Sequence, residues 1–229
     1  MKLFNLILVL SLVSCNSKNS KDITILNSIT NDKSMAELET NFHKLPKLFA
    51  VGDFDGDKKT DTIYQHNFSK LEKKEIDFAP NPMKTDWDEV IKWFYNQDAD
   101  VNLTLNRKTS EILHLGTAQG LYCLINIGDN NKDGKDEIAF VIDSCDDSRT
   151  NTCKIYTLCN EKWQLLKEFG IREDAFDWNK GETQPKFNSI KGYLEKQNNV
   201  WKYIDNNQNE YDSATEVGQM KVLKLNKCK

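Results

Sequence analysis

Two stretches of this chain carry oxygen-bearing side chains at the same spacing. Each opens on a Gly-Asp pair, and the Asp of that pair is taken here as position 1 of a loop. Oxygen ligands then stand at positions 1, 3, 5 and 9 of both stretches: Asp53, Asp55, Asp57 and Asp61 in the first loop, and Asp129, Asn131, Asp133 and Glu137 in the second. Carboxylates repel one another in a compact turn, and a hard dication that accepts about six to eight oxygens removes that repulsion. Both loops are therefore candidate cation sites.

The ligand types indicate which cation to expect. Neither loop contains Cys or His, which disfavours zinc. An irregular oxygen cage suits calcium better than magnesium, which requires a strict octahedron. A main-chain carbonyl at position 7, from Lys59 or Lys135, can complete the shell, and Gly56 and Gly134 permit the positive φ angles of a tight wrap. Asp- and Gly-rich hairpins are also ordinary soluble turns, but the repetition of the whole pattern favours up to two structural calcium ions.

The loops are not EF-hands. An EF-hand needs a bidentate Glu at position 12 and a helix on each side, whereas position 12 is Tyr64 in the first loop and Phe140 in the second. The pattern instead resembles the calcium loops of FG-GAP or VCBS-type repeats, the integrin-like β-propeller blades, whose consensus is Gly-Asp-x-Asn/Asp-x-Asp-Gly-x-x-Asp/Glu between two strands. The first loop departs from it at position 6, where Lys58 replaces the usual Gly. The resemblance implies an FG-GAP-like β domain in residues 23–229.

Strand-like segments surround the loops and would position them. Short runs rich in β-branched and aromatic residues predict strands at Leu121–Ile127, Ile138–Ile142, Cys153–Leu158, Trp163–Phe169, Gly192–Glu195, Val200–Ile204 and Lys221–Leu225. The run Ile138–Ile142 is apolar without alternation, as expected of a strand that stacked sheets cover on both faces. We therefore predict a mainly β fold of two or three blade-like antiparallel sheets. It would be a small or partial propeller-like structure, because the 215 residues from Cys15 onward, with two recognisable loops, are too few for a large propeller.

Two short helices are expected beside the sheets. The segment Ser34–His43 has Ser34 and Glu37 at the spacing of a capping box. A second helix would start after Thr85 or Asp86 as N-cap, since apolar residues recur at helical spacing at Trp87, Val90, Ile91, Phe94 and Tyr95. We expect this helix to pack its aromatic face on a core and to be inserted between the sheets.

The chain begins with a targeting segment. Residues 1–14 predict a signal peptide, because the apolar run from Leu3 to Val13 is far shorter than the about 20 residues that span a bilayer. Its end, Leu12-Val13-Ser14-Cys15, resembles the bacterial lipobox, which implies cleavage before Cys15 and acylation of that residue, with palmitate among the acyl groups. Residues 15–22 would be a lipidated, flexible tether. Asn16 stands where inner-membrane retention would need Asp, so the resemblance implies an outer-membrane lipoprotein that faces the periplasm or the cell surface.

Composition limits the classes of partner. A net charge of -4 and a pI near 5.5 argue against a nucleic-acid binder, which needs a basic face, and a mean hydropathy of -0.65 excludes a multispanning membrane protein. We expect a non-enzymatic binding module with a protein or glycan partner. One alternative is a cell-envelope hydrolase that uses acidic residues near the loops, since a catalytic pair of carboxylates leaves no local spacing signature. Another is an inhibitor of an envelope-active enzyme.

Cysteines and histidines complete the candidate chemistry. Beyond Cys15 the odd set Cys123, Cys145, Cys153, Cys159 and Cys228 must leave a thiol free or externally paired in an oxidising compartment. Cys145 and Cys153 flank a polar stretch and predict a hairpin-closing disulfide, while Cys159 could pair with Cys123 or with Cys228. The histidines lack metal-ligand spacing, and no nucleophile elbow or phosphate-binding loop is present. No catalytic residue is predicted.

Overall fold

The computed structural model describes residues 41–106, 111–146, 148, 150–176, 188–205 and 219–228. The chain divides into two units, Met1–Asn41 and Phe42–Lys229, and the sheets of the fold belong to the second unit. The predicted signal peptide, Cys15, the tether and residues 34–40 of the first predicted helix lie outside the described residues. Among the residues described, no helix combines the length and the hydropathy needed to span a membrane.

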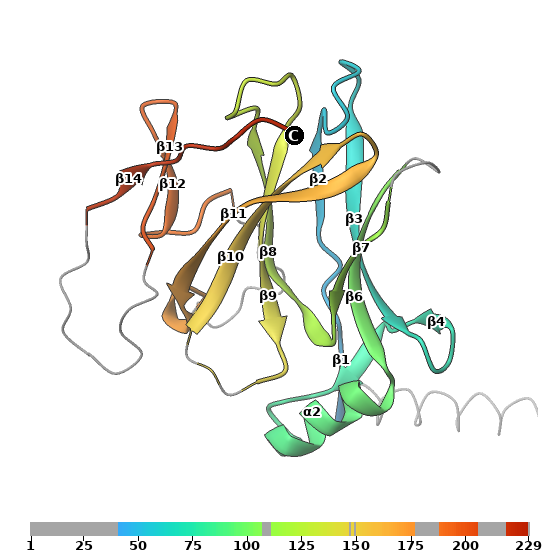
Figure 1. Cartoon of the computed structure of the whole chain (residues 1–229). Helices are drawn as coiled ribbons and strands as arrows, with labels where there is room; N and C mark the ends of the chain where they lie inside the picture. Colours follow the sequence, from blue (N-terminus) through green and yellow to red (C-terminus); the bar gives the residue numbers. More distant parts are fainter. Residues whose placement is uncertain are drawn as a thin grey trace, which may run out of the picture. The chain divides into compact units, whose positions relative to one another are not determined.

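Two antiparallel sheets repeat one strand order (Figure 1). The first contains β2 (Phe49–Gly52), β3 (Asp61–Ser69), β6 (Ala99–Leu105) and β7 (Leu113–Gly116), and a short strand β4 (Lys74–Glu75) extends it along β3. The second contains β8 (Ala118–Gly128), β9 (Glu137–Ser144), β10 (Thr150–Cys159) and β11 (Lys162–Arg172). Each is a meander of successive strands, and the first is interrupted between β3 and β6. The predicted mainly β fold with blade-like antiparallel sheets is confirmed.

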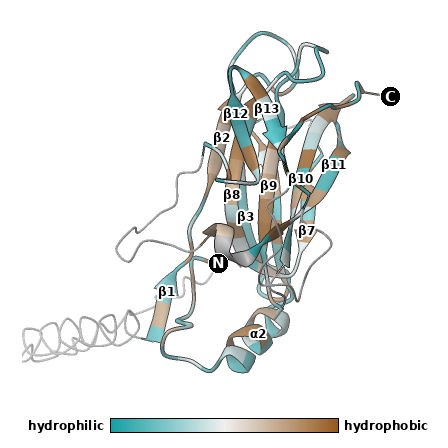
Figure 2. Ribbon diagram, turned by 90° about the vertical axis from the view of Figure 1, so that its left-hand side faces the viewer, coloured by the Kyte–Doolittle hydropathy of each residue, from teal (hydrophilic) through white to brown (hydrophobic). Residues whose placement is uncertain are grey.

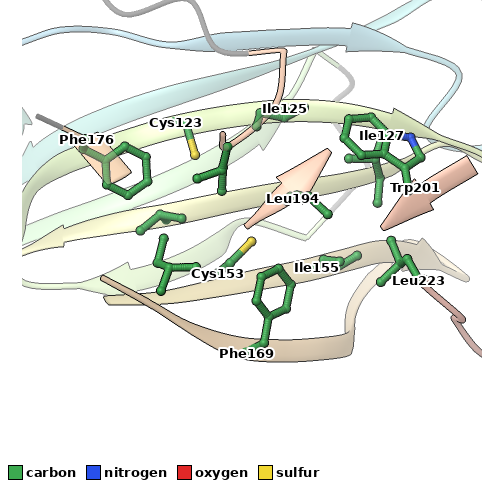
Figure 3. Close-up of a cluster of buried hydrophobic side chains, with 14 residues drawn as sticks. Cys123, Ile125, Ile127, Cys153, Ile155, Phe169, Phe176, Leu194, Trp201 and Leu223 are labelled. Atoms are coloured by element: carbon green, nitrogen blue, oxygen red, sulfur yellow. The ribbon is translucent and has the colours of Figure 1, made fainter. Parts of the chain in front are cut away.

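A third sheet covers the second. It consists of β12 (Leu194–Gln197), β13 (Val200–Tyr203) and β14 (Lys221–Val222), and a 3-10 turn, η1 (Glu173–Phe176), follows β11. Leu194, Trp201 and Leu223 pack on Cys153, Ile155 and Phe169 of the second sheet in one buried cluster (Figure 3). The second sheet is therefore the middle of three layers.

The middle position explains the composition of β9. Ile138 and Phe140 point into the core shared with the first sheet, whereas Ala139 and Val141 point into the core shared with the third. All these side chains are fully buried, and β9 is hydrophobic along most of its length (Figure 2). The prediction of a strand covered on both faces is confirmed.

The segment between β3 and β6 builds a smaller core at the end of the first sheet. Helix α2 (Trp87–Asn96) starts at the N-cap Asp86, whose Oδ1 accepts a hydrogen bond from Asp88 N at 3.0 Å. Its buried residues Val90 and Phe94 pack in a cluster with Leu45, Ile76, Ala79, Ala99 and Cys145. The strands β1 (Phe42–Lys44) and β5 (Phe78–Pro80) form a two-stranded sheet beside it.

Three predictions about the helices are wrong. The first predicted helix does not reach His43, because Phe42–Lys44 pair with β5 as a strand. Helix α2 lies at one end of the sheets rather than between them (Figure 1). Tyr95 is 60% exposed, because Trp93 takes its place against the core, with its ring 6.3 Å from Phe42 and 5.1 Å from Phe94.

The predicted disulfide is also wrong. Cys145 and Cys153 are both free and buried, as is Cys123, and the bond joins Cys159 to Cys228. Cys145 belongs to the small core around α2, whereas Cys153 belongs to the core between the second and third sheets. Two thiols in separate cores cannot meet, so the cross-link forms at the far end of β10, through one of the two alternative pairings that the sequence allows for Cys159.

Candidate metal centre

The two acidic loops occupy equivalent places in the two meanders. The first connects β2 to β3 and the second connects β8 to β9, which are the first and second strands of their sheets. Both loops close on the same pair of positions, since Gly52 lies opposite Asp61 and Gly128 lies opposite Glu137. Both lie at one end of the sheets (Figure 1). The sequence repeat is therefore a structural repeat.

Side-chain oxygens hold the backbone of each loop in the same way. At position 5, Asp57 N donates to Asp55 Oδ1 at 3.0 Å, and Asp133 N donates to Asn131 Oδ1 at 2.9 Å. At position 7, Lys59 N donates to Asp57 Oδ1 at 2.8 Å, and Lys135 N donates to Asp133 Oδ1 at 3.1 Å. These local bonds turn the oxygen-bearing side chains toward the inside of the wrap.

Positive φ angles recur at the same two positions of each loop. The first loop has Gly56 at position 4 and Lys58 at position 6, with φ of 81° and 66°. The second has Lys132 at position 4 and Gly134 at position 6, with φ of 60° and 92°. Lys58 therefore adopts the backbone conformation of the Gly that it replaces in the consensus.

Three carboxylates meet in the first loop. Each of Asp53, Asp55 and Asp57 offers an oxygen, and these oxygens all lie within 4.8 Å of one another. Asp53 also caps the loop, because its Oδ1 and Oδ2 accept from Gly56 N and Lys58 N, both at 2.9 Å. The ammonium of Lys59 lies 3.3 Å from Asp57 Oδ2. Asp61, at position 9, is buried.

The second loop gathers a deeper group. Oxygens of Asp129, Asp133 and Glu137 lie within 4.8 Å of one another, and Glu137 is fully buried. Glu137 Oε2 accepts from Asn130 N at 2.8 Å, whereas Glu137 Oε1 is buried and makes no hydrogen bond. Burial, with smaller contributions from Asp133 and Asp129, raises the pKa of Glu137 to about 7. This carboxylate is thus held beside two others with one oxygen uncompensated.

Asn131 links the second loop to the C-terminal segment. Its Nδ2 donates to Asp133 Oδ2 at 3.0 Å and to the carbonyl of Asn226 at 3.1 Å. Its Oδ1 accepts from Asp133 N, so Asn131 presents its Nδ2 to the carboxylate of Asp133 and is not part of the group of clustered oxygens formed by Asp129, Asp133 and Glu137. The ammonium of Lys135 donates to the carbonyl of Leu158 at 2.8 Å.

The donor set of the second loop fits a hard dication. Its clustered oxygens are those of three carboxylates, and the loop contains no Cys or His, as calcium prefers. A buried oxygen without a hydrogen-bond partner is costly unless something else compensates it, and Glu137 Oε1 is such an atom within the group. The first loop brings together the carboxylates of Asp53, Asp55 and Asp57 on a backbone held by the same hydrogen bonds as in the second loop.

Sequence reasoning missed two residues that join the loops. Asp136, at position 8 of the second loop, donates its N–H to Asp53 O at 2.8 Å and accepts from Asp53 N through its Oδ2 at 3.1 Å. Asn126 Nδ2 donates to the same oxygen of Asp136 at 2.8 Å and to Val51 O at 2.9 Å. The only signal in the sequence is a polar residue inside an apolar strand, at Asn126, and an acid between two ligand positions, at Asp136.

Two histidines also have partners that their sequence context did not reveal. On the outer face of the first sheet, His66 Nδ1 lies 2.8 Å from Glu75 Oε1 and His66 Nε2 lies 2.8 Å from Thr104 Oγ1. His114 Nδ1 lies 2.5 Å from Oδ2 of the buried Asp100. Neither group shares a side chain with the acidic loops.

Comparison of the chain with protein families, with curated proteins and with solved structures finds no match.

Proposed function

We propose that this protein is an outer-membrane lipoprotein, anchored through Cys15, whose β domain is stabilised by calcium and serves as a non-enzymatic binding module for a protein or glycan partner. One observation supports the calcium site above all others. Glu137 Oε1 is buried without a hydrogen bond beside Asp129 and Asp133. A dication would supply the compensation that this oxygen lacks.

The metal has a structural role in this proposal. Asp129, Asn131, Asp133 and Glu137 would hold one ion, with the carbonyl of Lys135, and Asp53, Asp55, Asp57 and Asp61 would hold another, with the carbonyl of Lys59. An ion bound only by the folded chain stabilises it by RT ln(1 + [L]/Kd), about 2.7 kcal/mol per site at a calcium concentration of 100 Kd. The ions would tie β2 to β3 and β8 to β9.

The outer face of the first sheet supports a binding role. Phe49 and Tyr64 lie opposite each other on β2 and β3 and are 60% and 45% exposed, and Val51 on the same face is 47% exposed. His66 and Thr104 continue this face as a hydrogen-bonding pair. Exposed aromatic side chains beside polar ones are common on surfaces that bind other molecules.

Thermal unfolding tests the calcium proposal. The melting temperature of the chelator-treated protein is expected to rise in millimolar calcium, and the rise is expected to shrink in Asp133→Ala. Glu137→Gln is the more discriminating variant, because its effect on the melting temperature is expected to have opposite signs in chelator and in calcium. Gln removes a buried charge, so Glu137→Gln is expected to match or exceed the parent in chelator and to fall below it in calcium.

The matched control makes the same chemical change at an exposed acid. Glu72, in the turn between β3 and β4, is exposed, so Glu72→Gln is expected to keep the full calcium response. A parent protein with the same melting temperature in calcium and in chelator would overturn the proposal. Equal losses for Glu137→Gln under both conditions would assign Glu137 a purely structural role.

A further inference from the structure

The two loops pack directly against each other. Their contact is formed by the Gly52-Asp53 end of the first loop, by Asp136 of the second loop and by Asn126 of β8. A Cβ on Gly52 would lie 2.5 Å from Asp136 Oδ2 and closer still to Asn126 Nδ2, so only Gly allows this approach. A Cβ on Gly56 would lie 3.2 Å from Gly134 O. The first loop therefore rests on the second along its length.

Asp136 connects a ligand of one loop to the ligands of the other. Its neighbours in the chain are Lys135 and Glu137, which are ligand positions 7 and 9 of the second loop. Its own carboxylate does not join the acids of that loop and instead accepts from Asp53 N at 3.1 Å and Asn126 Nδ2 at 2.8 Å. Asp53 is ligand position 1 of the first loop. An ion that fixes residues 135 and 137 thus fixes the group that holds the first loop.

We infer that calcium loads the second loop first and that this ion raises the calcium affinity of the first loop through Asp136. The inference rests on the proposed function. The first ion orders the contact between the loops, so binding of the second ion does not lose that conformational entropy again. The second ion therefore binds more tightly than it would alone, which is positive coupling. Asp136 is a positioning residue in this scheme, because its side chain acts on Asp53 and not on an ion.

The order in which the loops bind calcium follows from how available the carboxylate oxygens of each loop are to a cation. In the second loop the ammonium of Lys135 is engaged by Leu158 O, and the buried Glu137 has an oxygen to offer. In the first loop the ammonium of Lys59 lies 3.3 Å from Asp57 Oδ2 and competes with a cation for that carboxylate.

Direct electrostatics predicts the opposite sign. Filling one group of acids with a dication weakens the attraction that the same acids exert on a second dication, so uncoupled loops would show a weaker second step. That effect is screened at about 0.15 M salt, where the Debye length is about 8 Å. The sign of the coupling therefore distinguishes ordering through Asp136 from simple charge repulsion.

Calorimetric titration of the chelator-treated full chain with calcium chloride tests the inference. Disabling the second loop by Asp133→Ala is expected to weaken binding at the first loop by about fivefold or more relative to the second step of the parent. Disabling the first loop by Asp55→Ala is expected to leave the tighter step almost unchanged. Asp136→Ala is expected to reproduce the weakening of the second step while the first step stays within about threefold.

Two control variants separate the hydrogen bond from charge and from position. Asp136→Asn removes the charge and keeps an acceptor oxygen, so it is expected to retain most of the coupling. Thr60→Ala alters position 8 of the first loop, which is exposed, and is expected to behave as the parent. Hydrogen exchange of the Asp53 amide provides a second readout, and calcium is expected to slow it in Asp55→Ala but not in Asp133→Ala.

The outcomes separate the two proposals. If neither loop binds calcium, the proposed function fails. If the second loop binds calcium and the first loop does not bind it in the parent, the proposed function stands and the coupling is overturned. The same conclusion holds if the affinity of the first loop is unchanged or increased in Asp133→Ala. Equal coupling in Asp136→Ala and in the parent would overturn the role of Asp136.

Discussion

At the scale of single residues, positions 4 and 6 of each loop are occupied by one Gly and one Lys, in opposite order in the two loops. Gly56 and Lys132 share position 4, Lys58 and Gly134 share position 6, and all four have positive φ. Because a left-handed conformation costs a non-Gly residue about 1 to 2 kcal/mol, each loop has one relaxed position and one strained position. The Lys at position 6 of the first loop thus preserves the fold of the consensus at a cost in stability.

A pair of substitutions in the second loop measures that cost. Gly134 has no atom near the site of an added Cβ, so Gly134→Ala is expected to lower the unfolding free energy by about 1 kcal/mol through φ alone. Lys132→Gly is the control and is expected to stay within about 0.5 kcal/mol, because relief of strain and the extra freedom of the unfolded chain nearly cancel. Urea unfolding in chelator separates both values from calcium binding. A neutral Gly134→Ala would contradict the left-handed conformation.

The spacing of acids within each loop predicted which carboxylates lie close together. It could not predict the contacts between the two loops. Asp53, Asp55 and Asp57 meet within one turn, as do Asp129 and Asp133, so the order of residues along the chain contains that information. The partner of Asp136 is Asp53, which is 83 residues away. No pattern within either loop indicates that the second supports the first.

At the scale of elements, the strands of the middle sheet were predictable, whereas the polar residues buried in β6 were not. The predicted segments of the middle sheet fall inside β8 to β11. Strand β6 was not predicted, although its sequence alternates the buried apolar residues Ala99, Val101, Leu103 and Leu105 with polar ones, which is a strand pattern. Its buried positions include Asp100 and Asn102, which form cross-strand contacts with His114. The burial of these two polar side chains depends on the neighbouring strands, and the sequence of β6 alone does not indicate it.

For helix α2, the helical spacing of its apolar residues was predictable from the sequence. Which of its aromatic side chains are buried was not. Phe94 is fully buried and Tyr95 is 60% exposed. Phe94→Ala is therefore expected to cost about 3 to 5 kcal/mol of unfolding free energy, and Tyr95→Ala is expected to change it by less than about 0.5 kcal/mol. Urea unfolding of both variants at one calcium concentration provides the check. Similar losses for the two would mean that both rings face the core.

At the scale of the whole domain, three stacked sheets leave the third with the least local support. Its strands contain few residues, and one of them, β14, is Lys221–Val222. The C-terminal segment after β14 returns to the second sheet, where Asn226 accepts from Asn131 and Cys228 is bonded to Cys159. The disulfide therefore closes the third layer onto the end of the middle sheet that carries the second loop.

Removal of this disulfide is expected to destabilise the domain more than any single loop substitution. Cys159 and Cys228 are separated by 69 residues. A cross-link that closes a loop of that length reduces the entropy of the unfolded chain and thereby raises its free energy by about 4 kcal/mol at 25 °C. Cys159→Ser with Cys228→Ser should lower the urea midpoint accordingly and make it insensitive to reductant. Cys145→Ser is the control, because its free thiol lies in a separate core and reductant should still lower its midpoint. A double variant that responds to reductant as strongly as the parent would show that another pair forms the cross-link.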